Sequence, residues 1–284
     1  MQNEKITYIS AKSKWYKIDF KEIWRYRDLI MLFVKRNITT SYKQTVLGPL
    51  WIIINPLIST VVFTVIFGVI AKTSPGGIPQ FLFYMSGNLL WGFFSGCLSK
   101  GSATFISNSR VFGKVYFPRM CSPISDIIFS FINYLIQMVV FIGLVVYYAF
   151  TNPNVQPNIY LCLVPIMVVQ TAVLGMGVGL IISSITTKYR DLNILVSFSV
   201  SLWMYVTPVV FPASKIADSG VSWLYPLFMA NPVAPIVEGY RYAFLGCGSF
   251  EMMYWLISLA VTALVVLFGL LVFNKVEKNF IDTV

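Results

Sequence analysis

The sequence contains no histidine, and this absence removes the commonest metal ligand and the commonest general base of enzymes. The four cysteines have none of the close pairings that bind zinc, and we interpret them as small apolar packing residues: Cys97, Cys121, Cys162 and Cys247. No paired acids or activated nucleophile suggest a hydrolase. We therefore expect no catalytic residues and no metal site in this chain.

The sequence also lacks the GxxxxGK[ST] loop that holds the phosphates of ATP. Its Lys-Ser and Lys-Thr pairs, Lys12-Ser13 and Lys72-Thr73, are not preceded by the required glycines. Ion-coupled transporters place ionisable residues within their spans, and here Asp126 alone is a candidate. Asp126 is better interpreted as an acid at the membrane interface or a helix N-terminus. Energy for any transport must then come from another subunit.

Charge is scarce, because Asp, Glu, Lys and Arg make up 11% of the chain and apolar residues 57%, with a mean hydropathy of +0.74. Soluble domains carry roughly 25% charge. Stretches without any charged residue reach the length of about 20 residues that crosses a bilayer: 51–71, 73–99, 127–187, 192–214 and 252–274. A polar run at 151–158 divides the longest of them. The sequence therefore predicts an all-α membrane protein with six transmembrane helices.

The predicted spans form a domain over 47–284 and cover 50–71, 79–99, 122–150, 159–185, 192–211 and 252–274. The loop at 100–118 joins the second and third spans. Between the fifth and sixth, the apolar stretches 221–230 and 233–246 are each too short to cross. Two such stretches in tandem predict a re-entrant helical hairpin within 213–250. Non-helical backbone at membrane depth is tolerated only where protein covers it or where it lines a watery cavity.

The placement of basic residues predicts the orientation of the chain. With both termini in the cytoplasm, all of the 21 Lys and Arg residues face inside except Lys72, Lys215 and Arg241. This distribution follows the positive-inside rule. It accounts for the net charge of +10 without nucleic acid as a partner, since no basic and aromatic binding module accompanies the charge.

The N-terminal region has two parts, a polar cytoplasmic tail at 1–17 and an amphipathic segment at 18–46. In the second, apolar residues recur at helical spacing, Trp24 among them, and basic residues fill the remaining positions. Such a helix is typical of the membrane interface. The alternative is a soluble helix packed on a partner. A turn at Gly48-Pro49 then directs the chain into the first span.

Polar and aromatic side chains form stripes at helical spacing along three spans. Aromatic faces stack on sugars, and amide or hydroxyl tips hydrogen-bond to them, so the stripes are compatible with a path for a neutral glycan. They are equally compatible with ordinary helix packing. The residues are Asn55, Ser59 and Phe63 in the first span, Phe81, Tyr84, Asn88 and Trp91 in the second, and Ser197, Ser201 and Tyr205 in the fifth.

Five segments, in this order and spacing, carry a resemblance to a known family: 24–29 (WRYRDL), 42–51 (YKQTVLGPLW), 114–119 (KVYFPR), 188–191 (KYRD) and 231–241 (NPVAPIVEGYR). The chain resembles the permease subunit of ABC-2 type polysaccharide exporters, the group that exports O-antigen, capsule or teichoic acid on a lipid carrier. The resemblance implies an ATP-driven exporter subunit in the bacterial inner membrane, without an ATPase site of its own. O-antigen is the substrate that we favour.

The resemblance also implies partners and sites. The partners are a second copy of the chain, two cytoplasmic subunits that bind ATP and Mg, membrane lipid and an undecaprenyl-diphosphate-linked polysaccharide. A coupling helix for the ATP-binding subunit falls on Asn108, Ser109, Arg110, Val111, Phe112, Gly113 and Lys114. The lipid diphosphate enters beside Arg36, Lys43, Leu47 and Gly48, although the two cations also fit plain interfacial anchoring. Glu238 and Arg241, spaced i,i+3 in the re-entrant segment, are assigned to an outer gate.

Two other functions remain open from the sequence. One is a scaffold that organises glycan assembly without transport. The other is an ABC-2 permease for a small amphiphile. ATPase activity that depends on this chain separates transport from the scaffold, and retention of a lipid-linked glycan in its absence separates the glycan from a small amphiphile.

Overall fold

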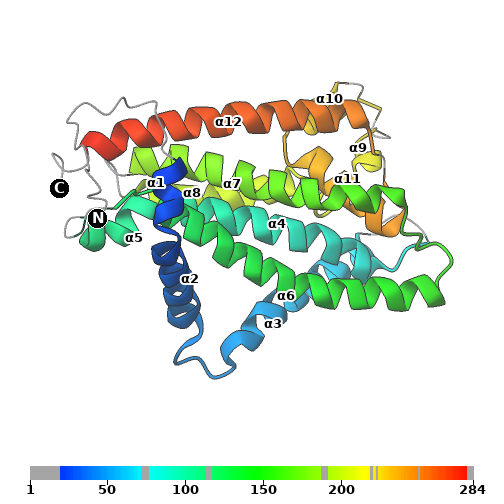
Figure 1. Cartoon of the computed structure of the whole chain (residues 1–284). Helices are drawn as coiled ribbons and strands as arrows, with labels where there is room; N and C mark the ends of the chain where they lie inside the picture. The colour runs from blue at the N-terminus through cyan, green and yellow to red at the C-terminus, as the bar shows by residue number, and fades with distance from the viewer. Residues whose placement is uncertain are drawn as a thin grey trace, which may run out of the picture.

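A computed structural model describes residues 20–71, 77–112, 115, 117–186, 191–217, 220–221, 223–248 and 250–279. Regular structure in these ranges is helical throughout. Four long helices run along one direction and pack on one another (Figure 1): α4 (Gln80–Ser102), α6 (Cys121–Thr151), α7 (Val164–Thr186) and α12 (Met252–Asn279). The predicted tail at 1–17 lies outside the described residues.

Five helical segments of the described chain are long and apolar enough to cross a membrane: Gly48–Ile70, Gln80–Ser102, Cys121–Thr151, Ile159–Thr186 and Met252–Val276. They match five predicted spans to within a few residues. The predicted fifth span corresponds to α8 (Leu192–Tyr205), a helix of 14 residues. At 1.5 Å per residue it extends about 21 Å, less than the hydrocarbon core of about 30 Å. A sixth full-length span is therefore not confirmed.

The first crossing segment is a composite of helix types. It begins with the 3₁₀ turn η1 (Gly48–Leu50), continues as α3 (Trp51–Phe63) and ends as the π-helical stretch η2 (Thr64–Ile70). Gly48 has a φ of +53°, which glycine adopts without strain, and it turns the chain from α2 into this segment. Pro56 lies inside α3.

Helix α7 occupies the centre of the bundle because its glycines let two neighbours approach closely. A Cβ on Gly179 would lie 2.8 Å from the carbonyl oxygen of Leu98 in α4. A Cβ on Gly177 would lie 2.9 Å from Cγ2 of Val266 in α12. Small residues at such contacts allow extensive backbone packing between membrane helices. The glycines thus set the distances of α4 and α12 from α7.

At one end of the bundle, α1 (Phe20–Arg25) and α2 (Arg27–Tyr42) lie across the long helices, near the short helix α5 (Thr104–Phe112) (Figure 1). Ile30, Phe33 and Val34 are the buried residues of α2. Trp24, by contrast, is 70% exposed. The segment predicted as an amphipathic helix is therefore helical, with a break at Tyr26, and its contact with a membrane surface stays a prediction.

The opposite end holds the short elements η3 (Ile159–Leu163), α9 (Ala213–Ala217), α10 (Leu224–Met229) and α11 (Ala234–Leu245) (Figure 1). Every residue of α11 from Ala234 to Arg241 is buried. This helix packs against α4, α7 and α12. Helices α10 and α11 thus lie on the two apolar stretches of the predicted re-entrant segment, and their depth in a bilayer stays a prediction.

Candidate functional site

A polar cleft of about 280 Å³ lies between α3, α4 and α6. Asn88, Gly92, Gly96 and Lys100 recur every four residues on α4, so one face of that helix forms the floor. The two glycines leave room there, and a Cβ on Gly92 would meet nothing within 4 Å. The remaining lining residues are Asn55, Pro56 and Ser59 of α3, Phe93 of α4, and Ser130, Asn133, Tyr134 and Gln137 of α6.

Side-chain amides tie the walls of the cleft together. Asn88 donates from Nδ2 to the carbonyl oxygen of Pro56 at 3.2 Å. Pro56 lacks an N–H, so the carbonyl oxygen of Ile52, four residues earlier, has no helical donor from that position. Gln137 donates from Nε2 to the carbonyl oxygen of Ile52 at 3.0 Å. The cleft is thus a built feature of three candidate spans.

The end of α2 closes one side of this cleft. The hydroxyl of Tyr42 donates to Oδ1 of Asn133 at 3.1 Å, and its ring lies 6.3 Å from the ring of Phe129. Burial raises the pKa of Tyr42, so the phenol stays protonated and able to donate. The turn that contains Leu47 and Gly48 follows directly in the sequence.

A second polar layer joins α2 to α5 and α6. Arg36 donates from Nη2 to Oδ1 of Asn108 at 2.9 Å, and Asn108 in turn donates to Oγ of Ser122 at 2.7 Å. Asn37 donates to Oδ1 of Asp126 at 2.7 Å. Asp126 therefore holds α2 against α6. This structural role is compatible with the predicted place of Asp126 at an interface.

The residues predicted for coupling divide between buried and outward positions. Asn108 and Phe112 of α5 are 3% and 7% exposed, and Phe112 packs 6.1 Å from the ring of Phe105. Val111 is half-buried. The side chains of Ser109 and Arg110, and all of Gly113 and Lys114, lie outside the described structure. Ser107, a residue that the sequence did not single out, is exposed on α5.

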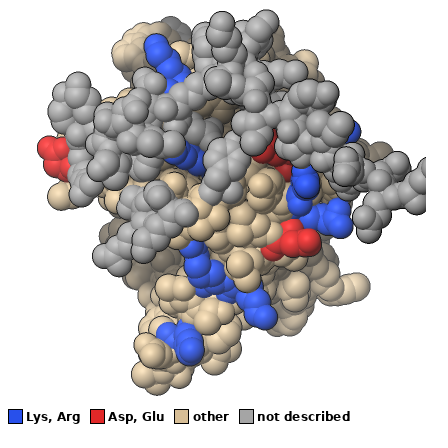
Figure 2. Space-filling view, turned by 60° about the vertical axis from the view of Figure 1, so that its left-hand side comes forward, with Lys and Arg blue, Asp and Glu red and all other residues tan. Residues whose placement is uncertain are grey.

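The residues predicted to admit a lipid diphosphate lie together at the α2 end of the molecule. Arg36, Lys43 and Leu47 are exposed, and Gly48 is half-buried. Figure 2 looks toward this end and shows several Lys and Arg side chains spread over it. The exposed cations described on α1, α2 and the turn that follows are Lys21, Arg25, Arg27, Lys35, Arg36 and Lys43.

The residues of the three predicted stripes lie in different environments. Asn55, Ser59 and Asn88 meet in the cleft. Ser197, Ser201 and Tyr205 lie on the exposed face of α8, away from it. Phe63 and Phe81 are half-buried.

Tyr84 and Trp91 do not line the expected glycan path, because their exposed fractions within the protomer are 0% and 5%. The Trp91 ring packs against the rings of Phe94 and Trp203, at 5.3 and 6.4 Å. Tyr84 packs on Phe83 at 5.2 Å. Aromatic residues at helical spacing serve the core here, and these two faces are not available to a passing sugar.

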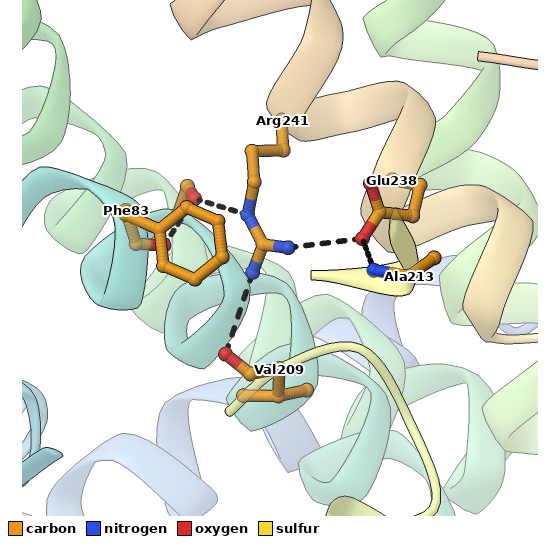
Figure 3. Close-up of polar contacts among 6 residues, drawn as sticks. Phe83, Val209, Ala213, Glu238 and Arg241 are labelled. Carbon is orange, nitrogen blue, oxygen red and sulfur yellow. Dashed lines mark hydrogen bonds and ion pairs between the residues drawn. The ribbon is translucent and has the colours of Figure 1, made fainter. Parts of the chain in front are cut away.

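Glu238 and Arg241 form a buried ion pair on α11, with Arg241 Nη1 3.2 Å from Glu238 Oε1 (Figure 3). The guanidinium also donates to the carbonyl oxygen of Val209 at 3.4 Å and lies 3.8 Å from the centre of the Phe83 ring. Oε1 of Glu238 accepts from the amide of Ala213 at 3.1 Å. The pair thus joins α11 to α4 and to the segment between α8 and α9.

Sequence reasoning missed most of the residues that line the cleft, including Lys100, Asn133, Tyr134 and Gln137. Lys100 was assigned to a loop, whereas α4 continues to Ser102 and carries it in its last turn. Asn133 and Gln137 are four residues apart in an uncharged stretch, and that spacing was the available signal.

Comparisons with known proteins give a consistent result. The profile of the family described as "ABC-2 type transporter" matches residues 28–245. The O-antigen export system permease protein RfbA of Klebsiella pneumoniae is 26% identical over 257 residues, which cover 90% of this chain and 94% of the relative. A protein of the same name from Myxococcus xanthus is 27% identical over 225 residues, which cover 79% of this chain and 83% of the relative.

Proposed function

Because the chain belongs to the ABC-2 type transporter family, we propose that it is the permease subunit of an ATP-driven exporter of a lipid-linked polysaccharide. The polysaccharide is an O-antigen, moved from the cytoplasmic to the outer face of the bacterial inner membrane. The observation that carries this proposal is the near end-to-end similarity to relatives named for O-antigen export. The bundle of long apolar helices supports a role in the membrane.

The proposed assembly has two copies of this chain and two ATP-binding subunits that hold ATP and Mg. The ATP-binding subunit docks at the end of the bundle that carries α5. Support comes from the packing of α5, because Phe105 and Phe112 anchor one face in the core and the exposed Ser107 leaves another free for contact. Force on such an anchored helix is transmitted to α4 and α6 through direct contacts.

The lipid diphosphate is proposed to enter beside Arg36, Lys43, Leu47 and Gly48. Cations at headgroup level pair with phosphate oxygens through charge-assisted hydrogen bonds. The exposed hydroxyls of α8 at Ser197, Ser201 and Tyr205 are proposed to face the glycan. The Glu238–Arg241 pair is proposed to hold the outer gate, because it fixes α11 against the segment between α8 and α9.

The experiment is to locate the lipid-linked glycan in cells that lack this chain. We expect the glycan to disappear from the cell surface and to accumulate in the membrane fraction. The accumulated glycan should be inaccessible to an externally added lectin until the cells are lysed. Re-expression of the chain should restore surface glycan, provided that the ATP-binding partner can hydrolyse ATP.

The outcomes also separate the alternatives. Loss of capsule or teichoic acid with normal O-antigen would keep the transport class and change the substrate. Unchanged surface glycans of every kind would contradict polysaccharide export. Loss of surface glycan without intracellular accumulation would favour a scaffold for synthesis.

A further inference from the structure

Lys100 is a cation in a candidate span, and its side chain has few partners. Its ammonium lies 3.5 Å from the centre of the Phe129 ring. Within the described part of the chain, this ammonium makes no ion pair and no hydrogen bond. Asp126 is close enough for the two charges to interact, and the last turn of α4 also favours a cation. Lys100 is half-buried, which is costly for a charge, and ionisable side chains within spans usually mark binding sites or pathways.

The cleft that Lys100 lines continues along α4 from this charge. Twelve residues separate Asn88 from Lys100, which corresponds to about 18 Å at 1.5 Å per residue. One end therefore presents a cation, and the rest presents neutral amides, hydroxyls and the rings of Phe93 and Tyr134. The volume of about 280 Å³ is near the lower limit of about 300 Å³ for small-molecule sites.

The lining retains unused hydrogen-bonding capacity. Asn133 accepts from Tyr42 through Oδ1, which leaves its amino group to donate. Gln137 and Asn88 donate to backbone carbonyls, which leaves their amide oxygens to accept. Lys100 and Asn133 thus suit the oxygens of an anion, whereas Asn88 and Gln137 suit hydroxyl groups.

We propose that the α3–α4–α6 cleft binds the headgroup of a lipid that carries a phosphate and hydroxyls. Lys100 holds the phosphate near the α2 end of the molecule, and the hydroxyl-bearing part lies toward Asn88. Two sources share this chemistry, an anionic phospholipid of the bilayer and the phosphate-bearing end of the lipid-linked cargo. The second source rests on the proposed function, whereas the first does not.

The test uses the full chain with its ATP-binding partner in nanodiscs of phosphatidylethanolamine with added phosphatidylglycerol. Lys100→Met removes the charge and keeps the length of the side chain. Gly92→Leu fills the cleft, where a Cβ meets no atom within 4 Å. Matched controls are Lys275→Met, an exposed cation on α12, and Gly143→Leu, which also meets nothing within 4 Å. Retained lipid is counted by native mass spectrometry, and a second set of nanodiscs contains undecaprenyl-diphosphate-linked glycan in neutral lipid.

We expect Lys100→Met to weaken retention of one of these lipids by about tenfold, the loss expected of one charge-assisted hydrogen bond. Gly92→Leu should weaken retention of the same lipid, because the added side chain occupies the space of the headgroup. The controls should retain it. Loss of phosphatidylglycerol with normal glycan export assigns the cleft to a bilayer lipid. Loss of the glycolipid together with export assigns it to the cargo. If both variants retain both lipids as the controls do, the proposal is wrong, and this holds whether or not the chain exports a glycan.

Discussion

Arg241 and Glu238 show how two charges can lie in the interior of a membrane protein. Arg241 is 0% and Glu238 1% exposed, and each has other polar contacts besides its partner. Gly87 contributes space, since a Cβ there would lie 2.7 Å from Nη2 of Arg241. Removal of one member of such a pair leaves an uncompensated buried charge, whereas removal of both need not.

We therefore predict that Arg241→Met lowers the free energy of unfolding by about 3–5 kcal/mol. The double variant Glu238→Gln/Arg241→Met should recover part of this loss, because no isolated charge remains. Thermal unfolding of the purified chain in detergent measures both. Lys275→Met, which removes an exposed cation, is the matched control. An Arg241→Met variant as stable as this control would contradict a structural role for the pair.

Single residues also show what the sequence could and could not predict about the site. The i,i+3 spacing of Glu238 and Arg241 is enough to predict their pairing, because residues at that spacing share a helix face. Helical spacing likewise predicts that Asn55 and Ser59 lie together. It does not tell which helix covers a face, so Tyr84 and Trp91 were expected on a path and lie in the core. That information comes from tertiary packing.

At the scale of elements, the apolar stretches predict the long helices well, because crossing a bilayer imposes length and composition together. They fail for α8, where the uncharged stretch continues to Ser214 although the helix ends at Tyr205. Freedom from charge signals burial or lipid contact and not helical structure. The turns at 206–211 pack beside α11 through Val209. The pattern of charged residues in the sequence does not reveal such an arrangement.

Helix α5 carries a prediction about coupling. Ser107→Asp places a charge on its exposed face while Phe105 and Phe112 keep their core contacts, so we expect the chain to fold and to lose much of its stimulation of the partner's ATPase activity. Steady-state ATPase rates of the purified complex measure this effect. Ser214→Asp, on an exposed residue at the other end of the molecule, should leave the rate unchanged. Equal rates for both variants would remove α5 from the coupling surface.

Helix α7 carries a prediction about packing. Gly177→Val should push α12 away, because a Cβ at this position would lie 2.9 Å from Val266 Cγ2 and the backbone of Gly269 also lies against Gly177. We expect destabilisation of about 1–3 kcal/mol, typical of overpacking. Gly143→Val, at a position where a Cβ meets nothing within 4 Å, should be nearly neutral in the same unfolding measurement. Similar stabilities for the two variants would contradict close packing of α7 on α12.

At the scale of the whole molecule, the ends of the bundle differ in charge. Exposed cations gather on α1, α2 and the following turn (Figures 1 and 2). Among the described residues of the other end, which holds η3 and α9–α11, Lys215 is the exposed cation and Arg241 is buried. The sequence predicted this polarity from counts of Lys and Arg, which follow from membrane insertion rather than from packing. Arg241 is explained as a partner in a buried ion pair, so it does not weaken the asymmetry.

We predict that Lys5→Cys and Lys278→Cys are protected from a membrane-impermeant thiol reagent in intact cells. Thr151→Cys, at the C-terminal end of α6, should react. The three variants need a Cys162→Ser background, because Cys162 is exposed whereas Cys97, Cys121 and Cys247 are buried. Reaction of the cysteine at position 5 or 278 with the external reagent would contradict the predicted topology.

The most direct test of the central claim is transport by the purified complex. The chain and its ATP-binding partner are reconstituted in vesicles with lipid-linked O-antigen, and the fraction of glycan protected from an added glycosidase is followed with time. We predict that ATP changes the protected fraction, and that vesicles lacking this chain, or holding a partner unable to hydrolyse ATP, show no change. A protected fraction that is the same with and without ATP in the complete complex would contradict the account.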